Sequence, residues 1–90
     1  MMLIKPAHLD DPNFFENSKA NIENFPNTFL VGCRLYQQSY FDKATECFRK
    51  IIEGRDKTLH YEARFNLGSC LFKMAEFEQA LKQFTTLLKE

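Results

Sequence analysis

Two stretches of this chain decide its fold, because the second repeats the apolar pattern of the first. Residues 28–48 read TFLVGCRLYQQSYFDKATECF, and residues 64–84 read RFNLGSCLFKMAEFEQALKQF. A shift of 36 residues aligns six identical pairs: Phe29 with Phe65, Gly32 with Gly68, Leu35 with Leu71, Phe41 with Phe77, Ala44 with Ala80 and Phe48 with Phe84. These identities fall on small or large apolar residues at helical spacings, so we predict an internal repeat of one supersecondary unit.

Each unit divides into two amphipathic segments with a short break between them. Proline is tolerated in the first turn of a helix, so Pro26 favours a helix start at that point. Ala44, Phe48 and Ile51 then share one face of a second segment that begins near residue 42. The pattern predicts helices over about residues 26–37, 42–53, 59–73 and 77–89, with tight turns at 38–40 and 74–76.

The two units are connected by residues 54–58. Gly54 occupies the position that follows a helix, where glycine is a common cap. Asp56 and Thr58 are residue types that cap the start of a helix, so we expect one of them to cap the third helix.

The first 25 residues lie outside the repeat and are expected to form a partly helical extension. Asp11 followed by Pro12 is a helix-start signal. The helix would cap the array or replace a helix of a preceding repeat. Its apolar face would contain Phe14, Phe15, Ile22 and Phe25.

Both units resemble the tetratricopeptide repeat, over about residues 26–57 and 58–90. The resemblance rests on Val31-Gly32-x2-Leu35 followed by Ala44-x3-Phe48, and on Leu67-Gly68-x2-Leu71 followed by Ala80-x3-Phe84. The chain departs from the family in four ways: Thr28 and Arg64 stand in the place of a tryptophan, Leu35 and Leu71 in the place of a tyrosine, the repeat-ending proline is missing, and the period is 36 residues.

The recurring glycine is the strongest physical support for this resemblance. A glycine inside a helix costs about 1 kcal/mol relative to alanine. Because Gly32 and Gly68 recur at one phase, we expect each to allow close approach of the paired helix, together with Ala44 and Ala80. Phe48 and Phe84 would be the large side chains that fill the layer between hairpins.

The resemblance implies an all-α fold of stacked antiparallel hairpins (an α-solenoid) and a non-catalytic scaffold that binds a partner polypeptide. The family's binding groove is lined by the first helix of each hairpin. The apolar i, i+4, i+7 stripes of the first helices would receive an extended or helical segment. The competing explanation is packing between neighbouring first helices or against residues 12–25. The groove residues are Phe29, Cys33, Tyr36, Phe65, Asn66, Ser69, Phe72 and Lys73.

Some members of the family clamp a C-terminal carboxylate with Lys and Asn side chains of this groove. Asn66 matches one such position and Lys73 is near it. Phe29 and Cys33 occupy the equivalent Lys and Asn positions of the first unit, so half of the clamp is missing. We therefore expect an apolar or mixed ligand rather than an acidic tail.

The last predicted helix carries an apolar face that no later helix of the sequence covers. Arrays of this kind usually end in a helix with a polar outer face. Three explanations remain: a fragment of a longer array, which we favour, self-association, or a partner that covers the face. This end face contains Leu81, Phe84 and Leu88, with Leu87 beside them.

Composition argues against several other classes of protein. The 12 basic and 12 acidic residues cancel, and no basic stripe is present that would favour nucleic acid or a membrane surface. No run approaches the roughly 18 apolar residues of a membrane span. RNA-reading helical repeats need a basic or amide-rich groove, which these Phe-lined helices lack.

The sequence also lacks the patterns of a catalytic or cofactor site. His8 and His60 have no Cys, His or carboxylate constellation around them, and no glycine-rich phosphate loop is present. The carboxylates of Asp10 and Asp11 are better explained by helix capping. An odd count of three cysteines without a CxxC pair indicates reduced thiols in a cytoplasmic protein, with no disulfide framework and no zinc site.

Overall fold

A computed structural model describes residues 25–89, and this part of the chain is all-α without a strand. The expected helix in the N-terminal extension lies outside the described residues, except that Phe25 is the first residue of the first described helix. Both predicted tight turns are confirmed at 38–40 and 74–76. The four helices are α2 (Phe25–Gln37), α3 (Phe41–Glu53), α4 (His60–Lys73) and α5 (Phe77–Lys89).

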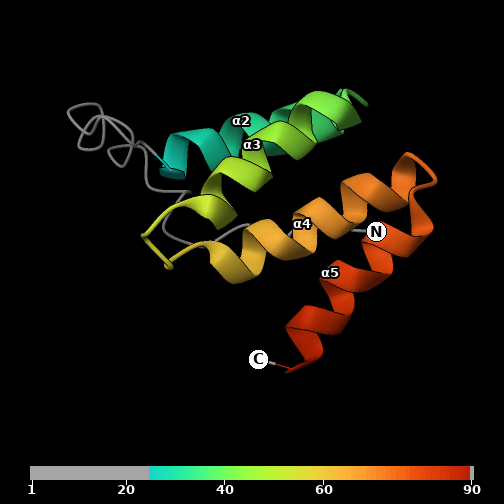
Figure 1. Cartoon of the computed structure of the whole chain (residues 1–90). Helices are drawn as coiled ribbons and strands as arrows, with labels where there is room; N and C mark the ends of the chain where they lie inside the picture. Colours follow the sequence, from blue (N-terminus) through green and yellow to red (C-terminus); the bar gives the residue numbers. More distant parts are fainter. Residues whose placement is uncertain (1–24, 90) are drawn as a thin grey trace.

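Each helix packs against the next one along the chain, and α2 also contacts α4. Figure 1 shows the two tight turns at one end of the molecule and the α3–α4 connection at the opposite end. The helices α2 and α3 therefore form one hairpin, and α4 and α5 form another.

The repeat of the sequence is also a repeat of contacts. The ring of Phe29 meets that of Phe48 at 5.7 Å between centroids. The equivalent rings in the second hairpin, Phe65 and Phe84, lie 5.8 Å apart. The pairs at the turns correspond in the same way: Tyr36 with Phe41 at 5.2 Å, and Phe72 with Phe77 at 5.3 Å.

Both glycines allow the close helix approach that the sequence predicts. A Cβ placed on Gly32 would lie 2.8 Å from Cε1 of Phe48, and one on Gly68 would lie 2.6 Å from Cε1 of Phe84. Both distances are shorter than van der Waals contact, so a phenyl ring takes the space that a methyl group would need. The sequence predicts that Phe48 fills the layer between hairpins, but its ring also packs against the glycine of its own hairpin.

The two tight turns close with the same hydrogen bonds. The amide of Tyr40 donates to the carbonyl of Leu35 at 2.8 Å, and that of Ser39 donates to Tyr36 at 2.9 Å. This pair of bonds is a Schellman cap, which needs a left-handed residue at its centre. The left-handed residues are Ser39, with φ 68°, and Ala75, with φ 62°.

The connection between the hairpins differs from the sequence prediction. The N-cap residue of α4 is Leu59, and no side chain caps the start of this helix. Asp56 instead accepts hydrogen bonds from the amide of Thr58 at 2.9 Å and from its hydroxyl at 2.6 Å. This local ring lowers the pKa of the Asp56 carboxyl, because hydrogen bonds favour the charged form. Gly54 does cap α3, through its amide and the carbonyl of Ile51, but with extended rather than left-handed backbone.

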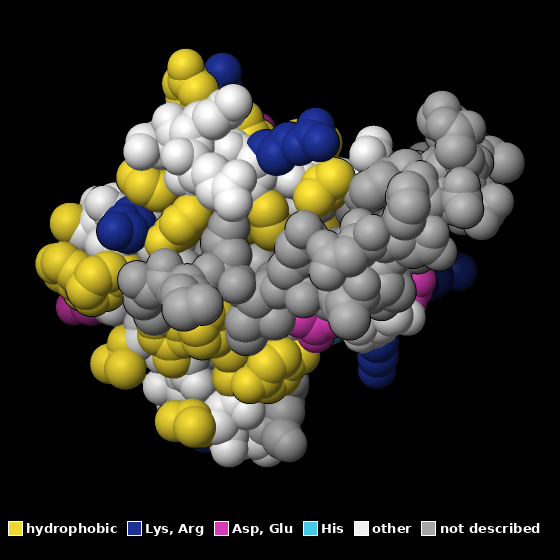
Figure 2. Space-filling model, turned by 180° about the vertical axis from the view of Figure 1, so that it is seen from behind, with side chains coloured by type: hydrophobic (Ala, Val, Ile, Leu, Met, Phe, Trp, Pro, Cys, Tyr) yellow, Lys and Arg dark blue, Asp and Glu magenta, His cyan; other side chains and the backbone are white. Residues whose placement is uncertain are grey.

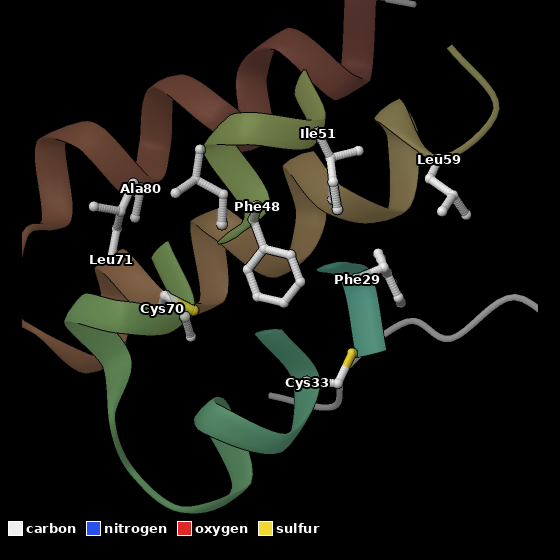
Figure 3. Packing of buried hydrophobic residues seen from close by; sticks show 11 residues of the cluster. Phe29, Cys33, Phe48, Ile51, Leu59, Cys70, Leu71 and Ala80 are labelled. Atoms are coloured by element: carbon white, nitrogen blue, oxygen red, sulfur yellow. The ribbon is translucent and has the colours of Figure 1, made fainter. Parts of the chain in front are cut away.

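One apolar core runs through both hairpins. Figure 3 shows the ring of Phe48 at its centre, with Cys33 and Phe29 on one side and Cys70 on the other. Ala44 and Ala80, the small residues expected at the helix contacts, are both buried. The full set of buried apolar residues is Phe29, Cys33, Ala44, Phe48, Ile51, Leu59, Ala63, Leu67, Cys70, Leu71 and Ala80.

Candidate interaction surfaces

Four of the eight predicted groove residues are buried and present no surface to a partner. Phe29 lies edge-on against Phe48, inside the first hairpin. The amide of Asn66 approaches Sγ of Cys33 at 3.8 Å, which joins α4 to α2. The hydroxyl of Ser69 donates to the carbonyl of Phe65 at 3.1 Å, within its own helix. Packing between the two first helices, the competing explanation for this stripe, accounts for Cys33 and Asn66.

The other four predicted groove residues reach the surface to different degrees. Tyr36 and Phe65 are half-buried, whereas Phe72 and Lys73 are exposed. Burial raises the pKa of the Tyr36 phenol, with the nearby Cys70 thiol adding to the effect. The accessible part of the predicted groove therefore lies at the end of α4 near its turn.

Two aromatic pairs mark the turn ends of the hairpins. Each pairs a residue near the end of a first helix with the first residue of a second helix, as described above for Tyr36 and Phe41. We call these four residues, Tyr36, Phe41, Phe72 and Phe77, the turn-end aromatic surface. The sequence prediction missed Phe41 and Phe77, although the 36-residue register aligns them and places both directly after a turn. Tyr40 precedes Phe41 in the chain. Nζ of Lys43 lies 5.4 Å from the centroid of the Tyr40 ring, which is a cation–π contact.

The predicted end face on α5 is divided by its packing. Phe84 is half-buried against Gly68, so it belongs mostly to the hairpin interior. Leu81 and Leu88 are 66% and 88% exposed. Seen from behind, apolar side chains gather over the lower part of the molecule, where Figure 1 places α5 (Figure 2).

This exposed face is flanked by polar and charged side chains. It borders an open depression of about 530 Å³. The residues around that depression are Glu78, Leu81, Lys82, Thr85, Thr86 and Lys89.

A polar seam joins α3, α4 and α5. The guanidinium of Arg64 donates to Gln83 at 2.8 Å, and that of Arg49 donates to Gln79 at 3.5 Å. Arg49, Arg64 and Glu53 border a hollow of about 200 Å³. Both arginines contact side-chain amides of α5, so the seam links α3 and α4 to α5.

The three cysteines are free thiols in different surroundings. Burial raises the pKa of the Cys70 thiol to about 12, and a hydrogen bond with Thr45 opposes part of this rise. Burial also raises the pKa of Cys47, which is only half-buried. Since the thiolate is the reactive form, Cys70 is a poor nucleophile and a poor metal ligand.

Few side chains in the described part of the chain are arranged for catalysis or metal binding. Nε2 of His60 is 3.1 Å from the carbonyl of Gly54, which ties α4 to the connection. Within residues 25–89, no three His, Cys, Asp or Glu side chains come together as a possible metal site. His8, Asp10 and Asp11 lie outside the described residues. None of the helices α2 to α5 has the length and apolar character to cross a membrane.

No family model matches the chain, and no curated protein or solved structure is significantly similar to it.

Proposed function

We propose that this chain is a non-catalytic polypeptide-binding module, built as a tetratricopeptide-like solenoid of two hairpins. The 36-residue repeat of ring pairs, glycine contacts and Schellman turns supports the solenoid arrangement. The observation that carries the function is the amount of large apolar surface left exposed around these hairpins. A small domain gains stability by burying such side chains, so leaving several uncovered favours a binding role.

The turn-end aromatic surface is the proposed contact for a partner segment. Phe72 is 48% exposed although its ring is already positioned by Phe77. Aromatic side chains held in place lose little conformational entropy on binding, which makes them effective contacts. Lys73, the next residue, is also exposed and adds a cation to this end of α4, consistent with a ligand of mixed apolar and polar character.

Substitution of Phe72 tests this site. Peptides selected on the whole chain from a random library should bind the Phe72→Ala variant about tenfold or more weakly, as expected for loss of an aromatic contact. Adding Tyr36→Ala should weaken binding further. Fluorescence anisotropy would measure the affinities.

Tyr61 provides a matched control. It lies on α4 like Phe72 and is 52% exposed, but it is outside the proposed surface. Tyr61→Ala should leave peptide binding unchanged. Equal affinity of the selected peptides for the wild type and Phe72→Ala would contradict a binding role of this surface.

Self-association through α5 is a second candidate function. The exposure of Leu81 and Leu88 is the observation that favours it. Sedimentation of the wild type and of Leu88→Glu would test it, because a buried glutamate at a dimer contact would dissociate the dimer.

A further inference from the structure

The internal repeat shows what kind of element would cover the exposed face of α5. The helices α3 and α5 are equivalent by the 36-residue shift. Within residues 25–89, however, α3 packs against both α2 and α4, whereas α5 packs mainly against α4. Thr45 of α3 is 7% exposed, whereas its counterpart Leu81 is 66% exposed. Ile52 is half-buried, whereas its counterpart Leu88 is 88% exposed. In both pairs the uncovered residue is a leucine, and Leu81 is more apolar than the buried Thr45.

The helix α4 supplies the template for a covering helix. The Thr45 hydroxyl lies against the thiol of Cys70, and Ile52 borders the same hollow as Leu67. Ala63, Leu67 and Cys70 are buried and spaced i, i+4, i+7, so they form one stripe along α4. A stripe of small and aliphatic residues at this spacing is thus what packs on an α3-type face.

The flanking charges of α5 indicate how its occupant differs from α4. Lys82 stands where α3 has Glu46, and Lys89 stands where α3 has Glu53. Both lysines border the open depression beside Leu81. Glu78 borders the same depression, so its surroundings carry two cations and one carboxylate among these residues. A covering helix would therefore gain from carboxylates on the flank that faces Lys82 and Lys89. It would also need an apolar residue against Leu81, where α4 places Cys70 against Thr45.

A second copy of this chain fits the face poorly. Its α4 stripe is already buried. The α2 residues equivalent to Ala63, Leu67 and Cys70 are Asn27, Val31 and Arg34, and all three are exposed. Stacking α2 of one copy on α5 of another would place the Arg34 guanidinium at Leu81, which would bury a charge against an apolar side chain.

Antiparallel pairing of two α5 helices is also unfavourable. A two-fold axis near Thr85 would bring Lys82 of each copy close to Lys89 of the other. Like charges at such an interface disfavour the pairing.

We propose that α5 docks an amphipathic helix of a different polypeptide, which lies along α5 as α4 lies along α3. Its stripe has small and aliphatic residues at i, i+4 and i+7, and its flanks carry carboxylates that face Lys82 and Lys89. This inference rests on the proposed polypeptide-binding function and places a second binding site away from the turn-end aromatic surface.

The test uses a designed helical probe. A side-chain-stapled peptide of about 18 residues, or five helical turns, carries Ala, Leu and Ala on the stripe and Glu on both flanks. Stapling preorganises the helix and so reduces the entropy lost on binding. The matched probe replaces each Glu by Lys.

The glutamate probe should bind the whole chain, with NMR shift changes concentrated on α5. Its affinity should fall about tenfold or more in Leu88→Glu and in Leu81→Glu, where each tenfold loss corresponds to about 1.4 kcal/mol. Tyr61→Glu should bind it unchanged. The lysine probe should bind about tenfold more weakly at low salt, and high salt should narrow that difference.

Three results would overturn the inference. They are absence of binding by either probe, equal binding of the glutamate probe to Leu88→Glu and the wild type, and a dimer that Leu88→Glu dissociates. If library peptides still require Phe72 while the glutamate probe fails, the polypeptide-binding function stands and only the α5 site is refuted.

Discussion

The helices α3 and α5 occupy the same position in two hairpins, yet one is buried on two sides and the other on one. Phe48 of α3 is completely buried, whereas its equivalent Phe84 is half-buried. The sequence of α5 is the more apolar at the uncovered positions, as Leu81 and Thr45 illustrate. In these two hairpins, burial depends on the neighbouring helix as well as on the residue itself. Exposed leucines on α5 therefore mark an available surface, not a different fold.

The largest predicted difference between the two hairpins concerns their central phenylalanines. Phe48→Ala should lower the free energy of unfolding by about 3–5 kcal/mol, as for a fully buried aromatic residue. Phe84→Ala should cost roughly half as much, because water can enter the space beside α5. Urea unfolding followed by circular dichroism would measure both.

A pair of less disruptive substitutions keeps this comparison measurable if Phe48→Ala unfolds the chain. Phe48→Leu and Phe84→Leu should show the same order with smaller losses, about 1–2 kcal/mol for the first. Equal losses in the two hairpins would show that the open flank of α5 does not matter for stability.

The covered interface between α3 and α4 should also make stability depend on pH. The folded Cys70 thiol has a pKa of about 12, whereas an unfolded thiol has a pKa of about 8.5–9. Above pH 9 the unfolded chain loses this proton and the folded chain keeps it, so stability falls as pH rises. The loss approaches about 1.4 kcal/mol per pH unit, or about 2 kcal/mol by pH 10.5.

Serine variants isolate the contribution of this thiol. Cys70→Ser does not titrate in this range, so its stability should fall less steeply than that of the wild type above pH 9. Cys47→Ser should retain the steep dependence, because Cys47 is only half-buried. Identical slopes for the wild type and Cys70→Ser, from chemical unfolding at each pH, would argue against a buried Cys70.

The smallest predicted effect concerns the left-handed residues of the two tight turns, where both hairpins should change in stability by the same amount. Ser39 and Ala75 have left-handed backbone, which costs a residue with a side chain about 1–2 kcal/mol. Ser39→Gly and Ala75→Gly should each stabilise the chain by up to about 1 kcal/mol, after the entropy of glycine in the unfolded chain is subtracted. Thermal unfolding would detect these gains. A clear difference between the two variants would show that the turns, too, depend on their neighbours.

Local pattern predicted the helices well, but it did not predict which of the groove residues are exposed. The turns at 38–40 and 74–76 were predictable because the apolar phase changes at these points. The Schellman caps were not, because Ser39 and Ala75 are not the glycines that usually mark them. Asp56 was a reasonable helix cap by residue type, but a hydrogen bond to Thr58 competed for its carboxylate.

The predicted groove illustrates the limit of a helical wheel. The spacing of Phe29 and Cys33 correctly indicates a shared face, but it does not say what covers that face. In the structure Phe29 meets Phe48 and Cys33 meets Asn66, so the stripe is interior. Phe65 and Phe72 of α4 correspond to Phe29 and Tyr36 by the 36-residue shift, yet Phe72 is exposed because it lies at the turn end.

The sequence by itself determined the all-α class, the 36-residue period, and the small residues at Gly32 and Gly68 where helices meet. These features depend on spacing along one chain, which the amino-acid order contains directly. Only the tertiary structure decided which apolar residues are buried and which remain exposed. Phe29 and Leu88 are both large apolar side chains on amphipathic helices. The physical difference between them is whether another helix of residues 25–89 packs against the side chain.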